Sequence, residues 1–265
     1  MKIQILSDLH NEFLRGDNVP FNHHWSGSIP ETDADIIVLA GDIDTGQRGA
    51  DWAIEESVRL SKPVIYVLGN HEFYRHEYSS LKNEVSDLCD GTDVHCLDYG
   101  ELIYRGLRFI GATLWTDYAV DTRLPQDLSM FYVEKGLADH KVISYKYGDK
   151  TRRFTPLDAL SIHKNELSWI EKQLAQPFDG KTVVITHHGP HPVCRHPDYP
   201  MSDIGSAFYS DLSRLIERFD IDLWIYGHTH ANLDTVISST RILSNQAGYP
   251  GENVKGFDAG FVLDL

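Results

Sequence analysis

Short apolar runs, each followed directly by a block that contains metal-binding residue types, constrain this chain more than any other feature. Five runs, several of them continuous and rich in β-branched residues, show this pattern: Lys2–Leu6, Ile36–Ala40, Val64–Leu68, Thr182–Thr186 and Leu223–Tyr226. Continuous apolar runs of this length are typical of strands that are buried on both faces of a sheet. Because the carboxyl ends of parallel strands meet at one edge of a sheet, we expect the polar blocks to converge there.

The rest of the chain supplies further strands and helices in alternation. The additional predicted strands are Arg108–Ala112, Thr235–Ser238, Arg241–Leu243 and Phe261–Leu263. Apolar side chains at helical spacing predict helices within Tyr78–Leu88 and Phe208–Phe219, and a third that begins after Thr155 with Pro156 and Asp158 completing a capping box. This alternation predicts an α/β protein with a single domain over residues 1–265. The irregular stretch 115–153 is a candidate cap or substrate-facing insertion.

Composition excludes several classes of protein. The chain has 265 residues, 39 acidic against 24 basic, and a net charge of −15, which argues against binding to long duplex DNA. We find no apolar run near the roughly 20 residues of a membrane span and no leader-like start. The three cysteines lack paired spacing, which argues against a disulfide framework and favours a reducing, cytoplasmic location.

The polar blocks contain ligands for divalent metals. They are Ser7-Asp8-Leu9-His10, Gly41-Asp42-Ile43-Asp44, Gly69-Asn70-His71-Glu72, His187-His188-Gly189-Pro190 and Gly227-His228-Thr229-His230. Any one block has an ordinary explanation as a surface turn or a helix start, but five of them after five strands indicate a metal centre. Imidazole, carboxylate and amide oxygen without thiolate suit Mn, Fe or Zn. Seven ligands are too many for one catalytic ion, and they suit two ions that share a carboxylate.

Together and in this order, the five blocks resemble the signature of the calcineurin-like metallophosphoesterases. The resemblance implies a four-layer α/β/β/α sandwich of two mixed sheets flanked by helices. It also implies two divalent ions that activate a hydroxide for attack on a phosphate ester. The ligand roles that it implies are Asp8, His10 and His230 for the first ion, Asn70, His187 and His228 for the second, and Asp42 as the bridge. His71 would then assist the leaving oxygen rather than bind metal.

Other residues near the blocks are candidates for substrate contact, namely His188, Tyr74 and Arg75. Two departures from the family pattern leave questions open. Position 45 is Thr where many relatives have an acid that orients the catalytic histidine, and the nearby acid is Asp44, so the partner of His71 is undetermined. The segment Asn245–Pro250 lacks the Pro and Arg of similar proteins, and the basic cluster Lys150–Arg153 is the candidate replacement.

The expected activity is hydrolysis of small phosphate esters. We favour phosphodiesters with a nucleotide-like substrate, while a phosphomonoesterase and a catalytically silent metal-binding scaffold for protein partners remain the alternatives. Binding of short single strands is compatible with the acidic composition, whereas binding of a long duplex is not. The ligand set by itself does not choose between diesters and monoesters.

Overall fold

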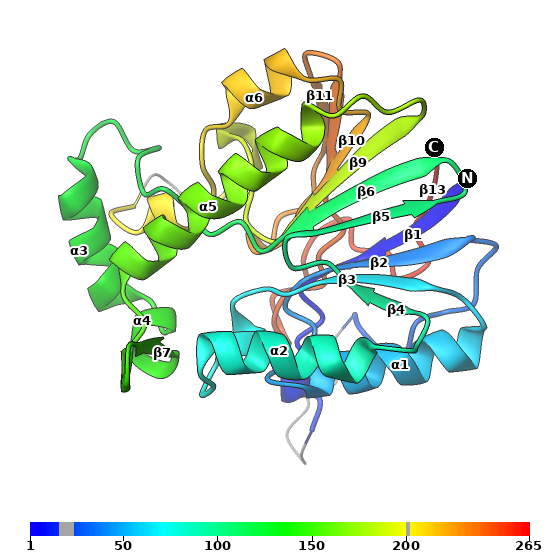
Figure 1. Ribbon diagram of the computed structural model, residues 1–265, viewed down its shortest axis with the longest axis horizontal. Coiled ribbons are helices and arrows are strands. Elements are labelled where there is room, and N and C mark those ends of the chain that lie inside the picture. The colour runs from blue at the N-terminus through cyan, green and yellow to red at the C-terminus, as the bar shows by residue number, and fades with distance from the viewer. Residues whose placement is uncertain (16–23, 200–201) are drawn as a thin grey trace.

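Two sheets packed face to face, each covered by helices on its outer side, make up the body of the protein (Figure 1). The computed structural model describes residues 1–15, 24–199 and 202–265. One sheet has the strand order β13-β1-β2-β3-β4 and the other the order β11-β12-β10-β9-β6-β5. The expected four-layer α/β/β/α sandwich is therefore confirmed.

The first sheet is parallel except at one edge. Its strands are β1 (Lys2–Leu6), β2 (Ile36–Ala40), β3 (Val64–Val67), β4 (Val94–Cys96) and β13 (Val262–Asp264), of which β13 runs antiparallel to β1. Helices α1 (Arg48–Leu60) and α2 (Tyr78–Cys89) lie along its outer face (Figure 1).

The second sheet has a parallel centre and antiparallel edges. Its strands are β5 (Gly100–Tyr104), β6 (Leu107–Ala112), β9 (Lys181–Thr186), β10 (Leu223–Ile225), β11 (Asp234–Ile237) and β12 (Thr240–Leu243). The edge strands β5 and β11 are the antiparallel ones. Helices α5 (Pro156–Leu174) and α6 (Ser213–Arg218) cover its outer face (Figure 1).

The apolar runs fill three core layers because each strand is covered on both faces. In β2, Ile36, Val38 and Ala40 pack between the sheets, while Ile37 and Leu39 pack toward the helices of the first sheet. All five of these side chains are fully buried. A strand that is buried on both sides has no polar face, which explains why these runs show no alternation.

The predicted strands and helices agree with the structure except in a few places. The helix expected within Phe208–Phe219 covers only Ser213–Arg218, because the backbone before it bonds to the segment that follows β9. There the Gly189 N–H donates to the Phe208 carbonyl, and the Ser210 N–H donates to the Gly189 carbonyl. The predicted capping box of Thr155 and Asp158 is present at the start of α5. Sequence patterns missed α1, β4, β5 and the helices and strands within 115–153.

The stretch 115–153 contains its own small elements, which lie to one side of the sandwich (Figure 1). They are α3 (Gln126–Gly136), α4 (Asp139–Val142), β7 (Ser144–Tyr147) and β8 (Lys150–Arg153), with β7 and β8 forming a hairpin. Within the basic cluster, the Arg152 guanidinium binds the Asp158 carboxylate at the start of α5. None of the helices in the described part of the chain has the length and apolarity that a membrane crossing requires.

A buried carboxyl group on α5 predicts a dependence of stability on pH. Glu166 is fully buried, accepts one hydrogen bond from the Trp115 N–H (3.2 Å), and its Oε1 has no partner among the described residues. Burial and the nearby Asp98 raise the pKa of Glu166 to about 8. The unfolded chain releases this proton above its ordinary pKa of about 4.5, so folding becomes less favourable by about 1.4 kcal/mol per pH unit between about 4.5 and 8.

We therefore expect E166Q to remove this cost. In thermal or urea unfolding, the variant should match the wild-type protein near pH 5 and exceed it by a few kcal/mol near pH 8. Comparing the two proteins at each pH cancels the titration of every other group. A variant that is equally destabilised at both pH values would show that Glu166 is ionised in the folded protein.

Candidate metal centre

The polar blocks of both sheets meet at one edge of the sandwich, and backbone hydrogen bonds join them. The Gly227 N–H after β10 donates to the His187 carbonyl after β9 (2.9 Å). In the first sheet, the Asp8 N–H donates to the Gly41 carbonyl (3.0 Å), and the His10 N–H donates to the Asp42 carbonyl (3.1 Å). The expected convergence of strand ends is therefore observed.

The backbone at this edge adopts conformations that residues other than glycine rarely take. Five residues of the blocks have positive φ angles: Asp8, His10, Asp42, His228 and His230. Two glycines allow a further close approach, since a Cβ on Gly69 would lie 2.2 Å from Asp42 Oδ1 and one on Gly227 would lie 2.6 Å from Asp8 Oδ2. Clusters of unusual backbone of this kind are typical of functional sites.

The first cluster of possible ligands consists of Asp8, His10 and His230, whose ligand atoms all lie within 4.8 Å of one another. The Nε2 atoms of His10 and His230 are 3.1 Å apart. His230 Nε2 also lies 3.5 Å from Asp8 Oδ1. Three donor atoms from two strand ends thus face one point.

The second cluster consists of Asp42, His187 and His228. His187 Nε2 lies 3.3 Å from Asp42 Oδ1 and 3.0 Å from Asn70 Oδ1, which adds the amide oxygen to the group. The other oxygen of Asp42, Oδ2, lies 3.8 Å from His10 Nε2 of the first cluster. Asp42 therefore stands between the two clusters.

Several atoms of these clusters lack a suitable hydrogen-bond partner in the described part of the protein and would be satisfied by a bound cation. Asp8 Oδ2 and His228 Nε2 are buried and have no hydrogen-bond partner among the described residues. The Nε2 atoms of His10 and His230 can satisfy each other only by sharing a proton or a cation. Burial opposes charge on His230, yet Asp8 and Glu252 raise its pKa to about 10, so this position favours a positive charge. The donor set suits divalent ions.

Neighbouring groups fix the orientation of the candidate ligands. His187 Nδ1 faces the Ala40 carbonyl (2.9 Å) and His230 Nδ1 faces a carboxylate oxygen of Glu252 (2.5 Å), so each ring turns Nε2 toward the centre. Asn70 Nδ2 donates to Asp139 (2.9 Å), which leaves its Oδ1 toward His187. Such outer contacts are common around metal-binding histidines.

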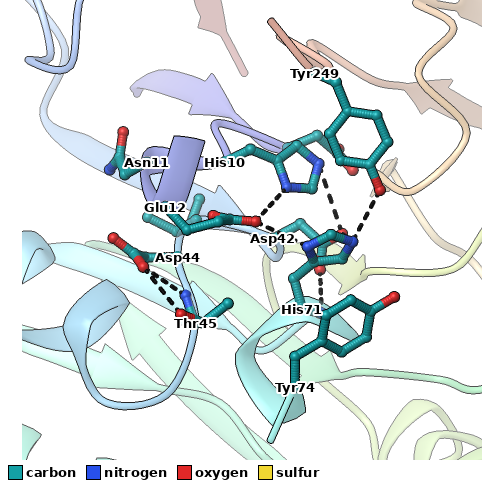
Figure 2. A network of polar contacts seen from close by, with 12 residues as sticks. His10, Asn11, Glu12, Asp42, Asp44, Thr45, His71, Tyr74 and Tyr249 are labelled. Atoms are coloured by element: carbon teal, nitrogen blue, oxygen red, sulfur yellow. Dashed lines mark hydrogen bonds and ion pairs between the residues drawn. The ribbon is translucent and has the colours of Figure 1, made fainter. Parts of the chain in front are cut away.

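His71 is held at both ring nitrogens, as Figure 2 shows. Its Nδ1 lies 2.8 Å from Glu12 Oε1, the same oxygen that lies 3.1 Å from His10 Nδ1. Its Nε2 lies 2.9 Å from the Tyr249 hydroxyl. Asp44, the acid near position 45, binds Arg15 and the Thr45 N–H instead. Sequence analysis missed Glu12, although Asp8, His10 and Glu12 stand at alternate positions in the chain.

The charges around His71 favour its protonated form. Burial alone would lower its pKa, but the carboxylates of Asp42 and Glu12 raise the pKa of His71 above its ordinary value. Burial likewise opposes the charge on Glu12, yet its hydrogen bonds with His10 and His71 lower the Glu12 pKa to about 2. Glu12 is therefore a carboxylate that accepts from both rings.

The three candidate substrate contacts lie in different surroundings. Tyr74 stacks on the His71 ring (centroids 4.2 Å apart) and donates its hydroxyl proton to Asp139 (2.8 Å). His188 is 2% exposed and packs against His228 and Trp115. Arg75 is exposed, and its backbone takes a positive φ. Of these three, only Tyr74 is among the described residues that line the cavity at the site.

Glu72 is a second acid that sequence analysis did not place in the site. Each of its oxygens accepts two hydrogen bonds: Oε1 from the Ile43 N–H and the Tyr66 hydroxyl, and Oε2 from the Asp42 and Gly69 N–H groups. Burial and Asp42 raise the pKa of Glu72 to about 7. Nevertheless all four partners are donors, so the geometry fits the ionised carboxylate. Glu72 thereby fixes the loop that carries Asp42.

A cavity of about 450 Å³ opens beside the two clusters. Its lining includes the candidate ligands Asp42, His228 and His230 and the apolar side chains Leu137, Ile204 and Phe208. Arg195 is the single Lys or Arg among the described residues that line it. The cavity therefore places apolar side chains beside the candidate metal ligands.

Comparison with known proteins identifies the family. Residues 1–232 match the sequence profile of the calcineurin-like phosphoesterases. The chain belongs to the calcineurin-like phosphoesterase family. It is accordingly a metal-dependent phosphoester hydrolase, and this family binds two divalent ions.

Individual relatives support the same fold. The mimivirus protein L509 of Acanthamoeba polyphaga mimivirus, described as uncharacterized, is 26% identical over 94% of this chain and 92% of its own length. The crystal structure of phosphopantetheinyl hydrolase (PptH) from Mycobacterium tuberculosis has a TM-score of 0.75 at 16% identity, covering 98% of this chain and 94% of that one. The protein TT1561 of Thermus thermophilus has a TM-score of 0.50 at 14% identity, covering 92% of this chain and 88% of that one.

Proposed function

We propose that this phosphoesterase hydrolyses phosphodiesters of a small, nucleotide-like organic group, with His71 supplying the proton for the leaving oxygen. The observation that carries the diester preference is the cavity, whose lining places the apolar side chains Leu137, Ile204 and Phe208 beside the candidate metal ligands. A diester has two esterified groups, and the group that does not leave needs room of this kind. The stretch 115–153, which contributes Leu137 and Asp139 to the wall, acts as a cap that selects this group.

The charges of the cavity also favour a diester. A diester phosphate carries one negative charge, whereas a monoester carries about 1.5 to 2 near neutral pH. Apart from its histidines, the described lining includes Asp139 and Glu252 but a single basic side chain, Arg195. A second negative charge on the substrate would therefore find little compensation outside the metal centre.

In this proposal the first ion is held by Asp8, His10 and His230, and the second by Asn70, His187 and His228, with Asp42 between them. When bound, the ions neutralise phosphate charge and generate hydroxide near neutral pH. Mn, Fe and Zn all suit this ligand set. The protein's own contribution is to fix the ligand rings, exclude bulk water and present the proton of His71.

The test compares a diester with a monoester on the same protein. Metal-stripped protein is reloaded with Mn²⁺, Fe²⁺ or Zn²⁺, and hydrolysis of bis-p-nitrophenyl phosphate and p-nitrophenyl phosphate is followed side by side. We expect no turnover without metal, two ions bound per chain after reloading, and a higher kcat/KM for the diester.

Two outcomes would contradict the proposal. A higher kcat/KM for the monoester would assign a phosphomonoesterase, and the apolar part of the cavity lining would then need another explanation. The absence of turnover on both compounds and on thymidine 5′-p-nitrophenyl phosphate, with two ions bound, would favour the scaffold alternative. Metal content measured on the same samples separates these results from incomplete reloading.

A further inference from the structure

The Tyr249 hydroxyl occupies the position from which His71 would reach a substrate. It lies 2.9 Å from His71 Nε2, the nitrogen that Glu12 leaves free (Figure 2). His71 is only 5% exposed and is not among the described residues that line the cavity, whereas Tyr249 is. A substrate that enters the cavity therefore meets the phenol before the imidazole.

The surroundings of Tyr249 hold its ring over the metal centre. Its ring centroid lies 4.4 Å from that of His10 and 4.6 Å from that of His230. Its backbone N–H donates to Glu252 Oε2 (2.9 Å), the oxygen that also faces His230 Nδ1. One carboxylate thus fixes both a ligand of the first cluster and the loop that carries the phenol.

From this geometry we propose that Tyr249 is a catalytic residue that relays the proton from His71 to the leaving oxygen; the proposal rests on the function proposed above. As the oxygen of hydroxide bonds to phosphorus, the P–O bond to the leaving group breaks and its electron pair stays on the leaving oxygen. That oxygen takes the hydroxyl proton of Tyr249, and the Tyr249 oxygen takes the Nε2 proton of His71. His71 ends neutral, with its remaining proton on Nδ1, where it donates to Glu12. Its Nε2 regains a proton from solvent.

The demand of the leaving group for a proton provides the test. Nitrophenolate is a stable anion and leaves without protonation, whereas phenolate, a much stronger base, depends on a general acid. Hydrolysis of bis-p-nitrophenyl phosphate and diphenyl phosphate is therefore measured for wild-type protein, Y249F, H71N and Y74F. For Y249F we expect a loss of about 100-fold in kcat on diphenyl phosphate and less than about threefold on the nitrophenyl ester.

Y74F is the matched control, because it also removes a phenol hydroxyl from the cavity. The Tyr74 hydroxyl bonds to Asp139 and not to a nitrogen of His71. Any loss that it causes should be equal for the two substrates. Metal content, melting temperature and the calorimetric Kd for inorganic phosphate are measured for each variant. In Y249F all three should equal the wild-type values, because the ring and its packing remain and only proton transfer is removed.

The variants separate the failure of the relay from the failure of the proposed function. If H71N loses activity mainly on diphenyl phosphate while Y249F does not, His71 reaches the substrate directly and the relay is wrong. If H71N loses activity equally on both substrates, His71 is not the acid and the proposed function fails at that step. If Y249F loses metal or binds phosphate more weakly, Tyr249 has a structural role and the relay is likewise wrong.

Discussion

H71N should lower kcat by about 10²- to 10⁴-fold on a diester with a poor leaving group, while both metal ions stay bound. The expectation follows from the position of the ring. His71 lies beside His10 and Asp42 in a further group of possible ligands, but its Nδ1 already faces Glu12 and its Nε2 faces Tyr249, so both ring nitrogens have partners. Asparagine keeps a polar group near Glu12 and limits the damage to packing.

Metal analysis of the purified variant, combined with turnover on diphenyl phosphate, checks this result. H10N provides the comparison, because His10 shares the oxygen of Glu12 but belongs to the first cluster. We expect H10N to lose bound metal and activity together. Should H71N lose an ion to the same extent, His71 would be a ligand and its role as the acid would have to be withdrawn.

E72Q should destabilise the fold and weaken metal binding even though Glu72 belongs to neither ligand cluster. Each of the two oxygens of Glu72 accepts hydrogen bonds from two donors. In the Gln variant, the amide nitrogen replaces one of these oxygens, and its two hydrogens would face donor groups. Hydrogen bonds to a charged group contribute about 1.5–3 kcal/mol each, so the loss of two costs about 3–6 kcal/mol. In a chain of this size, that corresponds to a fall of about 10 °C in melting temperature.

Differential scanning calorimetry and metal titration of E72Q measure the two effects. The exposed Glu55 on α1 offers a matched control, since E55Q makes the same chemical change without burial and should shift the melting temperature by less than about 2 °C. An E72Q protein that melts with the wild type and retains both ions would mean that the Asp42 loop is held by other contacts.

Local patterns in the sequence predicted the α/β class and the sheet edge at which the polar blocks meet, whereas the two-sheet sandwich was implied by the resemblance to the family. Buried strands such as Ile36–Ala40 are apolar throughout, and the blocks that follow them contain the residue types that metals require. The amphipathic stripe of α2 also identified its helix. Features of this kind can be found from a single sequence, because each is determined within a few residues.

The partners of His71 could not be found in the same way. Glu12 lies 59 residues from His71 in the chain and Tyr249 lies 178 residues away, so only the fold brings these side chains together. Asp44 was the more obvious acid by position, but its contact with Arg15 directs it away from the centre. The role of Glu72 was hidden for a similar reason, since three of its four donors come from β3 and the loop after β2.

The spacing of the proposed ligands along the chain also determines when the metal centre can assemble during translation. His10 and His230 face each other across 220 residues of sequence, and Tyr249 is still further along. During translation, β1 and its two ligands leave the ribosome long before the strand that delivers His228 and His230. The nascent chain thus cannot close the first cluster until His230 has been made and has left the ribosome, so the complete set of proposed ligands meets a metal ion only after that point in synthesis.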